Sequence, residues 1–135
     1  MIRPLTTQMT RAQIYPLQFR LMSNKIVDSS TYIKEMQDPK DWQSAMENET
    51  RPVLIQAGAS WCGPCQVLKP QLLDVVKEHN GAVEYLYVDV DKHSEIAQML
   101  EIQSIPICYI VKKGELIDSM TGVPRDGKKG IEAFI

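Results

Sequence analysis

Cysteine and long apolar runs are scarce in this sequence. Only 3 of its 135 residues are cysteines, too few for the disulfide framework that holds many small secreted domains together. No run approaches the roughly 18 apolar residues of a membrane-spanning helix, and the N-terminus lacks the compact apolar core of a secretory signal. The sequence therefore predicts a protein that neither spans a membrane nor is exported by the usual route.

A net excess of basic residues is also missing. The chain has 15 lysines and arginines against 17 acidic residues, which gives a net charge of −2 at pH 7. Domains that bind nucleic acid usually carry a basic excess, so no nucleic acid is expected as a partner. The 135 residues, 44% of them hydrophobic, are enough for one globular domain and too few for two.

Basic charge gathers instead at the N-terminus. The first 27 residues contain four basic residues and no acidic one, include two prolines, and show no sustained periodicity of apolar residues. Residues 1–30 are therefore predicted to form an irregular arm in front of a domain at 31–135. Three interpretations stay open for the arm: a transit peptide, most simply mitochondrial, a solvated tail, or a segment that docks on a large protein complex. The predicted location is the mitochondrion, with the cytoplasm as the alternative.

From Thr31 onward, patterns typical of strands and helices alternate. The sequence predicts strands near 32–36, 52–57, 83–89, 107–111 and 116–121, and helices near 39–50, 62–79, 94–100 and 126–135. Asp38 and Ser94 are the predicted N-caps of two of these helices, and residues 112–115 are a predicted hairpin turn. This alternation is typical of an α/β fold.

Two of the three cysteines, Cys62 and Cys65, form a C-x-x-C pair at the start of the helix predicted at 62–79. Unpaired backbone N–H groups and the helix dipole favour an anion there, which lowers the pKa of the first thiol. Cys62 is therefore the predicted nucleophile. Cys65, one turn further along and less exposed, is the predicted resolving thiol, which attacks a mixed disulfide formed on Cys62. Gly63 and Pro64 suit a junction between a strand and a helix.

A metal site is the alternative use of a C-x-x-C pair. A structural zinc ion needs four ligands, and the remaining candidates, Cys108, His79 and His93, do not show the spacing of zinc ligands. An iron–sulfur cluster within one molecule fails on the same count, whereas a cluster shared between chains stays open. We predict no metal site, a buried apolar role for Cys108, and solvated or capping roles for the two histidines.

The sequence resembles the thioredoxin family over roughly residues 31–135. The pentapeptide at 61–65 is the family's active-site motif, Pro70 lies where the family has a proline in its active-site helix, and Gly114 matches a glycine of the last hairpin. The resemblance implies a thioredoxin fold, an α/β architecture with a central mixed β-sheet flanked by helices. It also implies that Ile105 precedes a cis-proline. The implied motif and groove residues are Trp61, Cys62, Gly63, Pro64, Cys65, Ile105, Pro106 and Gly122.

The resemblance further implies a thiol–disulfide oxidoreductase that acts on protein disulfides through Cys62 and Cys65. A flavin- or ferredoxin-linked reductase of the thioredoxin-reductase type would reload the dithiol, and no cofactor would be bound besides the Cys62–Cys65 disulfide itself. The alternative is an accessory or structural subunit of a larger, mitochondrial complex, with weak or no turnover. The intact motif favours the enzyme.

Three departures from the family pattern bear on mechanism. Gln56 stands where thioredoxins have a buried aspartate, and Tyr85 where they have its lysine partner. An amide has no titratable proton to exchange, so we predict slower deprotonation of Cys65. Gly58 stands where the family usually has a tryptophan, which predicts a thinner apolar wall beside the dithiol. Asp89 and Asp91 are predicted to be solvated turn residues.

Overall fold

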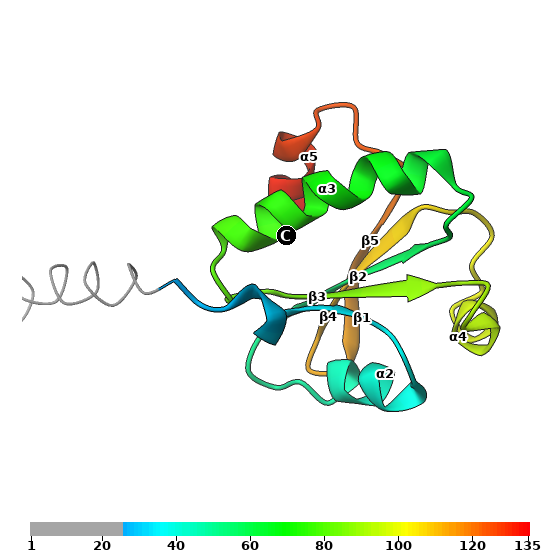
Figure 1. Ribbon diagram of the computed structural model, residues 1–135, viewed down its shortest axis with the longest axis horizontal. Helices are drawn as coiled ribbons and strands as arrows, with labels where there is room; N and C mark the ends of the chain where they lie inside the picture. Colours follow the sequence, from blue (N-terminus) through cyan, green and yellow to red (C-terminus); the bar gives the residue numbers. More distant parts are fainter. Residues whose placement is uncertain (1–25) are drawn as a thin grey trace, which may run out of the picture.

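A mixed five-stranded sheet forms the centre of the computed structural model, which describes residues 26–135 (Figure 1). Residues 1–25, most of the predicted arm, lie outside the described residues. In chain order the elements are η1 (Ser29–Thr31), β1 (Ile33–Glu35), α2 (Pro39–Met46), β2 (Val53–Gly58), α3 (Gly63–Glu78), β3 (Glu84–Asp89), α4 (Ser94–Met99), β4 (Ile107–Lys112), β5 (Glu115–Thr121) and α5 (Lys128–Phe134).

The strands lie in the order β1-β3-β2-β4-β5. Strands β1, β3 and β2 are parallel, β4 is antiparallel to β2, and β5 is antiparallel to β4. Every residue of β2 and β3 is buried, which explains why both segments read as mostly apolar runs. The predicted α/β fold with a central mixed sheet is confirmed.

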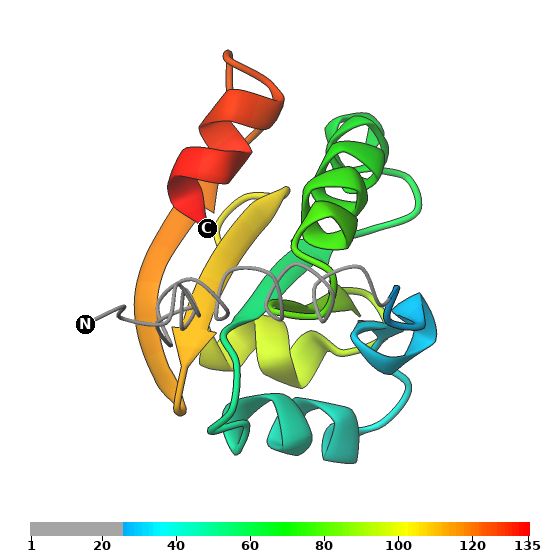
Figure 2. The same cartoon turned by 90° about the vertical axis from the view of Figure 1, so that its left-hand side faces the viewer.

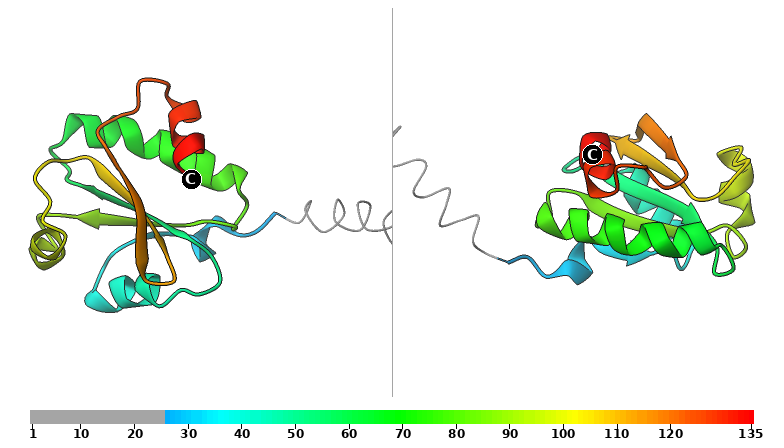
Figure 3. Two further views of the ribbon diagram at one scale, coloured as in Figure 1. Left: turned by 180° about the vertical axis from the view of Figure 1, so that it is seen from behind. Right: turned by 90° about the horizontal axis from the view of Figure 1, so that it is seen from above.

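Helices cover both faces of the sheet. In β2, Leu54 packs into the apolar cluster under α3 and α5, whereas Val53 and Ile55 pack into the cluster with α2 and α4. Figure 2 shows the sheet between these two layers, and Figure 3 shows the C-terminal helix α5 lying against α3. None of the helices in the described part of the chain is long and apolar enough to cross a membrane.

Helix α2 begins as predicted, at an N-cap formed by Asp38. The Asp38 carboxylate accepts a hydrogen bond from the Lys40 backbone N–H, and the Asp41 carboxylate accepts one from the Asp38 backbone N–H, which makes a reciprocal capping box. The helix ends at Met46 and not near Thr50, because the Asn48 side chain accepts the backbone N–H of Thr50 and turns the chain.

Two other predicted helix starts are wrong by one or two residues. Ser94 is the first residue of α4, and the N-cap position is occupied by His93. The His93 side chain makes no capping hydrogen bond; its Nε2 lies 3.0 Å from the Met36 carbonyl oxygen instead. Helix α5 begins at Lys128 and not at Asp126, after Gly127 with a φ of 55°. The start of α4 therefore involves a contact between His93 and a distant segment, which the local sequence does not show.

The predicted hairpin turn between β4 and β5 is confirmed. Lys112 and Glu115 pair across the two strands, and the two residues between them, Lys113 and Gly114, have φ values of 52° and 75°. Two successive left-handed residues are what the tightest hairpin connection requires. A Cβ on Gly114 would lie 3.1 Å from the Met46 carbonyl oxygen, so the turn also sits against the end of α2.

Candidate active site

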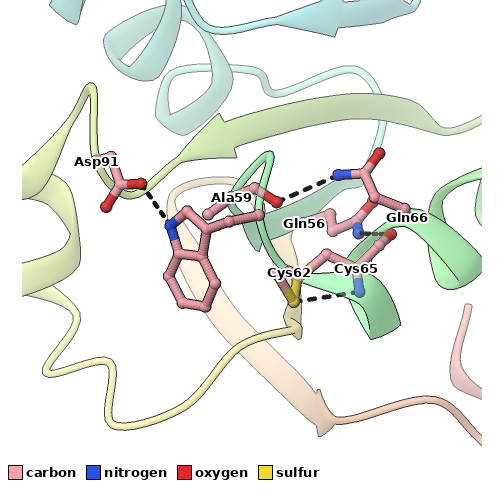
Figure 4. The surroundings of a disulfide bond; sticks show 7 residues. Gln56, Ala59, Cys62, Cys65, Gln66 and Asp91 are labelled. Carbon is pink, nitrogen blue, oxygen red and sulfur yellow. Dashed lines mark hydrogen bonds between the residues drawn. A yellow bond between two sulfur atoms is a disulfide. The ribbon is translucent and has the colours of Figure 1, made fainter.

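Cys62 and Cys65 lie where β2 passes into α3, and their sulfurs form a disulfide (Figure 4). Cys62 is the N-cap of α3, and its Sγ accepts a hydrogen bond from the Cys65 backbone N–H at 3.3 Å. Cys62 is 5% exposed and Cys65 is fully buried. A sulfur at a helix N-terminus that already accepts an N–H is placed where a thiolate is stabilised. This geometry suits Cys62 as the attacking sulfur and Cys65 as the inner one.

The turn before α3 is fastened by the carbonyl oxygen of Ala59. That oxygen accepts the Cys62 backbone N–H at 3.1 Å and the Gln66 side-chain amide at 3.2 Å (Figure 4). Gln66, the residue after Cys65, therefore connects the first turn of α3 to the loop that precedes the helix. The sequence analysis missed this role, since nothing in the local pattern indicates where a glutamine side chain at this position will point.

Trp61 is the large exposed side chain of the motif. Its side chain is 70% exposed, and its indole Nε1 donates a hydrogen bond to Asp91 Oδ2 at 2.7 Å (Figure 4). Asp89 is the last residue of β3 and is buried, so the prediction of a solvated residue is wrong for it. Its Oδ1 does support the turn, because it accepts the backbone N–H groups of Asp91 and Lys92. Asp91 does more than predicted, because it ties the loop after β3 to the active-site motif.

The loop before β4 packs against one side of the Cys62–Cys65 disulfide. Ile105 packs against the small cluster formed by Ala59, Cys62 and Cys65, and the Ile105–Pro106 peptide bond is cis. The backbone N–H of Gly122 donates to the Pro106 carbonyl oxygen at 2.9 Å, which joins the end of β5 to this loop. Beside it lies an open pocket of about 260 Å³, lined by Trp61, Val90, Ala97, Ile102, Gln103, Ser104 and Ile105.

Gln56 and Tyr85 form a buried neutral pair beneath Cys65. Gln56 Nε2 donates to the Cys65 carbonyl oxygen at 3.2 Å (Figure 4). Gln56 Oε1 accepts a hydrogen bond from the Tyr85 hydroxyl at 2.6 Å. Burial raises the pKa of Tyr85, so its hydroxyl keeps its proton and stays a donor. The two residues that the sequence analysis flagged as departures therefore contact each other and the resolving cysteine's backbone.

The space beside Gly58 is shared by the resolving cysteine and a tyrosine of the next strand. A Cβ on Gly58 would lie 3.0 Å from the Tyr87 hydroxyl oxygen and 3.2 Å from Cys65 Sγ. Tyr87 thus occupies part of the space where the sequence predicts a thinner wall. The sequence analysis missed Tyr87, although its position two residues after Tyr85 in a strand puts it on the same face of the sheet.

The three other candidate side chains lie apart from one another. Cys108 is buried on β4, opposite Gln56 in the strand register, and burial raises the pKa of its thiol to about 12. His93 is buried before α4, and His79 is the C-cap residue of α3. Within residues 26–135, no three His, Cys, Asp or Glu side chains are grouped closely enough to hold a metal ion.

A disulfide-forming cysteine pair at the N-terminus of a helix that follows a buried central strand defines a thiol–disulfide oxidoreductase. The thioredoxin family model matches residues 33–135, and the chain belongs to the thioredoxin family. Its resemblance to that family is confirmed, and protein disulfides are its class of substrate.

Curated relatives and solved structures agree with this assignment. The chain is 33% identical over 122 residues to the mitochondrial thioredoxin of Bos taurus, a match that covers 90% of this chain and 71% of the relative. It is 34% identical over 113 residues to the chloroplastic M-type thioredoxin of Spinacia oleracea, covering 82% of this chain and 62% of that one. It superposes on oxidized mitochondrial thioredoxin 3 of Saccharomyces cerevisiae with a TM-score of 0.66 and 25% identity, covering 80% and 97% of the two chains.

Proposed function

We propose that this protein is a mitochondrial protein-disulfide reductase in which Cys62 attacks and Cys65 resolves. The observation that carries the assignment of roles is the hydrogen bond from the Cys65 backbone N–H to Cys62 Sγ at the N-terminus of α3. It favours negative charge on Cys62 and leaves Cys65 buried behind it. The mitochondrial location is supported by the similarity to the thioredoxin of Bos taurus, which is named as mitochondrial. The relative from Spinacia oleracea is named as chloroplastic and does not support it.

The proposed reaction passes two electrons from the dithiol to the substrate. The Cys62 thiolate attacks one sulfur of a protein disulfide, and the other substrate sulfur leaves as a thiolate that takes a proton from water. Cys65 then loses its proton and attacks Cys62 Sγ in the mixed disulfide, which expels the second substrate sulfur. The products are a substrate dithiol and the Cys62–Cys65 disulfide that the structure contains.

The groove around the dithiol is suited to an extended peptide. Trp61 and Ile105 give it an apolar rim, and the turn at Gly122 leaves space, since a Cβ on this glycine would meet no atom within 4 Å. We propose that a flavin- or ferredoxin-linked reductase reloads the dithiol through the same surface and that no other cofactor is bound. No observation on residues 26–135 favours the accessory-subunit alternative.

Turnover on an insulin-like disulfide, with dithiothreitol as the electron donor, tests the assignment of roles. Cys62→Ser should abolish reduction, and Cys65→Ser should stop after one attack and accumulate a mixed disulfide. Cys108→Ser is the matched control, because this third thiol is buried and should leave turnover unchanged. Full activity of the Cys62→Ser protein would contradict the proposal.

The location needs its own experiment. Cell fractionation should place the protein in mitochondria, and mass spectrometry of the native N-terminus should show the loss of about 20–30 residues if the arm is a transit peptide. A protein found only in the cytoplasm with Met1 retained would contradict the mitochondrial assignment and leave the reductase chemistry intact.

A further inference from the structure

Tyr87 and Cys65 approach the same empty position from two different elements. The Tyr87 hydroxyl oxygen of β3 and Cys65 Sγ of α3 both lie within 3.2 Å of the point where a Cβ on Gly58 would stand. The oxygen and the sulfur are therefore no further apart than about twice that distance. Because residue 58 is a glycine, no side chain at this position separates them.

Tyr87 is buried, and it has a cation against its ring. The residue is 5% exposed, and Lys69 Nζ lies 4.1 Å from the centroid of its ring. The Tyr85 hydroxyl is committed to Gln56, but among the described residues the Tyr87 hydroxyl makes no hydrogen bond to another protein group. Burial raises the pKa of Tyr87, so the hydroxyl keeps its proton at neutral pH and can donate it.

We propose that the Tyr87 hydroxyl donates a hydrogen bond to the Cys65 thiolate formed in the resolving step. This inference rests on the proposed function, in which Cys65 must ionise to attack the mixed disulfide on Cys62. A hydrogen bond to the charged form of a group stabilises that form and lowers its pKa. Tyr87 therefore supplies, from β3, a hydrogen bond to the Cys65 sulfur that Gln56 does not supply, because the Gln56 amide donates to the Cys65 carbonyl oxygen.

The resolving step uses only water, the two cysteines and the substrate sulfur of the proposed reaction. The Cys65 S–H bond breaks, and its proton passes to water. The Cys65 sulfur then forms a bond to Cys62 Sγ, and the bond from Cys62 to the substrate sulfur breaks with its electron pair on the substrate. Tyr87 keeps its own proton throughout and only shares it with the Cys65 sulfur while that sulfur is charged.

Several other groups act on the same thiolate or on Tyr87. Cys62 faces Cys65 within the motif, and Lys69 adds positive charge from α3. The acidic groups whose charge raises the pKa of Tyr87 are Asp89 at the end of β3, Glu35 of β1 and Asp91 of the loop after β3. The remaining titratable residues of the buried cluster on this face are Tyr32, Tyr85 and Cys108. None of these is changed by removing the Tyr87 hydroxyl alone.

The test follows the two attacks separately with the aromatic disulfide dithiobis(nitrobenzoate) and the reduced protein in a stopped-flow instrument. Attack by Cys62 releases one coloured thiolate, and attack by Cys65 releases the second. At high concentrations of the probe the first release is fast, so the second reports the resolving step. Tyr87→Phe removes only the hydroxyl and keeps the ring under Lys69, and Tyr109→Phe is the matched control on the opposite face of the sheet.

We expect the Tyr87→Phe protein to show an unchanged first release and a second release roughly tenfold slower at pH 7. The pH at which the second release reaches half its maximum should move upward by about one pH unit. Tyr109→Phe should change neither. A second release with the same rate and pH profile in Tyr87→Phe as in the parent would overturn the inference, whereas absence of both releases in the parent would overturn the proposed function instead.

A measurement on the unaltered chain covers the case in which Tyr87→Phe does not fold. In the reduced protein, the ζ-carbon resonance of Tyr87 should shift over the same pH range in which the β-carbon resonance of Cys65 titrates. The Tyr109 ζ-carbon should show no such step. A Tyr87 resonance that ignores the ionisation of Cys65 would overturn the inference without any substitution.

Discussion

Trp61 Nε1 donates a 2.7 Å hydrogen bond to Asp91 Oδ2, although the Trp61 side chain is 70% exposed. An exposed indole ordinarily samples several rotamers, and fixing one of them costs side-chain entropy. The bond to a carboxylate on the loop after β3 offsets that cost and holds the ring at the edge of the groove before a substrate arrives. The orientation of this exposed motif residue is thus set by a neighbouring loop.

Asp91→Ala should release the Trp61 ring and lower kcat/KM for a protein disulfide by about threefold, because ordering the ring is then deferred to substrate binding. Turnover on an insulin-like disulfide measures the loss, and the intrinsic reactivity of Cys62 toward a small alkylating agent should stay the same. Asp126→Ala, at an exposed carboxylate before α5, is the control. An Asp91→Ala protein with unchanged kcat/KM would show that the hydrogen bond does not prepare the groove.

Gln56→Asp should speed disulfide reduction at neutral pH and add a titration to the rate profile, since a carboxylate can accept the Cys65 proton. The same change should lower the free energy of unfolding by about 2–4 kcal/mol at pH 7, because it buries a charge and removes the donor to the Cys65 carbonyl oxygen.

Gln56→Asn is the matched control for that experiment, since asparagine has the length of aspartate without its charge. It should share part of the loss of stability but show no added titration. Turnover from pH 5 to 9 and urea unfolding measure both effects. Kinetics of Gln56→Asp that match those of Gln56→Asn at every pH would contradict the account of residue 56.

The sequence predicts the fold well because its signals are local. Apolar runs predict β2 and β3, and Asp38 followed by Pro39 predicts the start of α2. The predicted end of α2 and the predicted start of α4 are wrong. The Asn48 side chain forms a turn that ends α2, and the His93 ring contacts the distant Met36 carbonyl oxygen.

The candidate site divides in the same way. Cys62, Cys65 and Gln56 follow from the motif and its spacing from β2. Asp91 and Tyr87 do not, because the hydrogen bond from Trp61 to Asp91 and the approach of Tyr87 to Gly58 arise only when β3 is placed beside β2 in register. Contacts between strands depend on register, which a single sequence does not specify residue by residue.

Burial of Cys108 should make the protein less stable as the solution becomes alkaline. Its pKa rises to about 12 from an ordinary value near 9.0, so the folded state binds this proton over a range in which the unfolded state has lost it. The contribution is fully present below pH 9 and is lost as the pH rises toward 12. Between pH 8 and 10 it should fall by about 1 kcal/mol.

The comparison is between a Cys62→Ser/Cys65→Ser protein and the same protein with Cys108→Ala, so that no disulfide can exchange in the unfolded chain. Chemical unfolding at pH 8 and pH 10 gives the two free energies. The protein that retains Cys108 should lose about 1 kcal/mol more than its partner. Equal losses would mean that the Cys108 thiol ionises as readily in the folded state as in the unfolded one.

Gly114→Ala should destabilise the protein by about 1–2 kcal/mol. Its φ of 75° disfavours any residue with a Cβ, and that Cβ would stand 3.1 Å from the Met46 carbonyl oxygen. Gly63→Ala is the control for stability, because a Cβ there meets no atom within 4 Å. Urea unfolding measures both, and a Gly114→Ala protein as stable as the parent would show that the hairpin relaxes freely.

The neutral pair of Gln56 and Tyr85 also simplifies the pH dependence of the reduction potential of the Cys62–Cys65 disulfide. The pKa of a carboxylate buried beside the dithiol would differ between the disulfide and dithiol forms. That difference would change the slope of the plot of midpoint potential against pH. The amide cannot ionise, and burial keeps the Tyr85 hydroxyl protonated. The slope of that plot should therefore change only where the two active-site thiols ionise, so the driving force for reduction does not depend on the charge of the core beneath them.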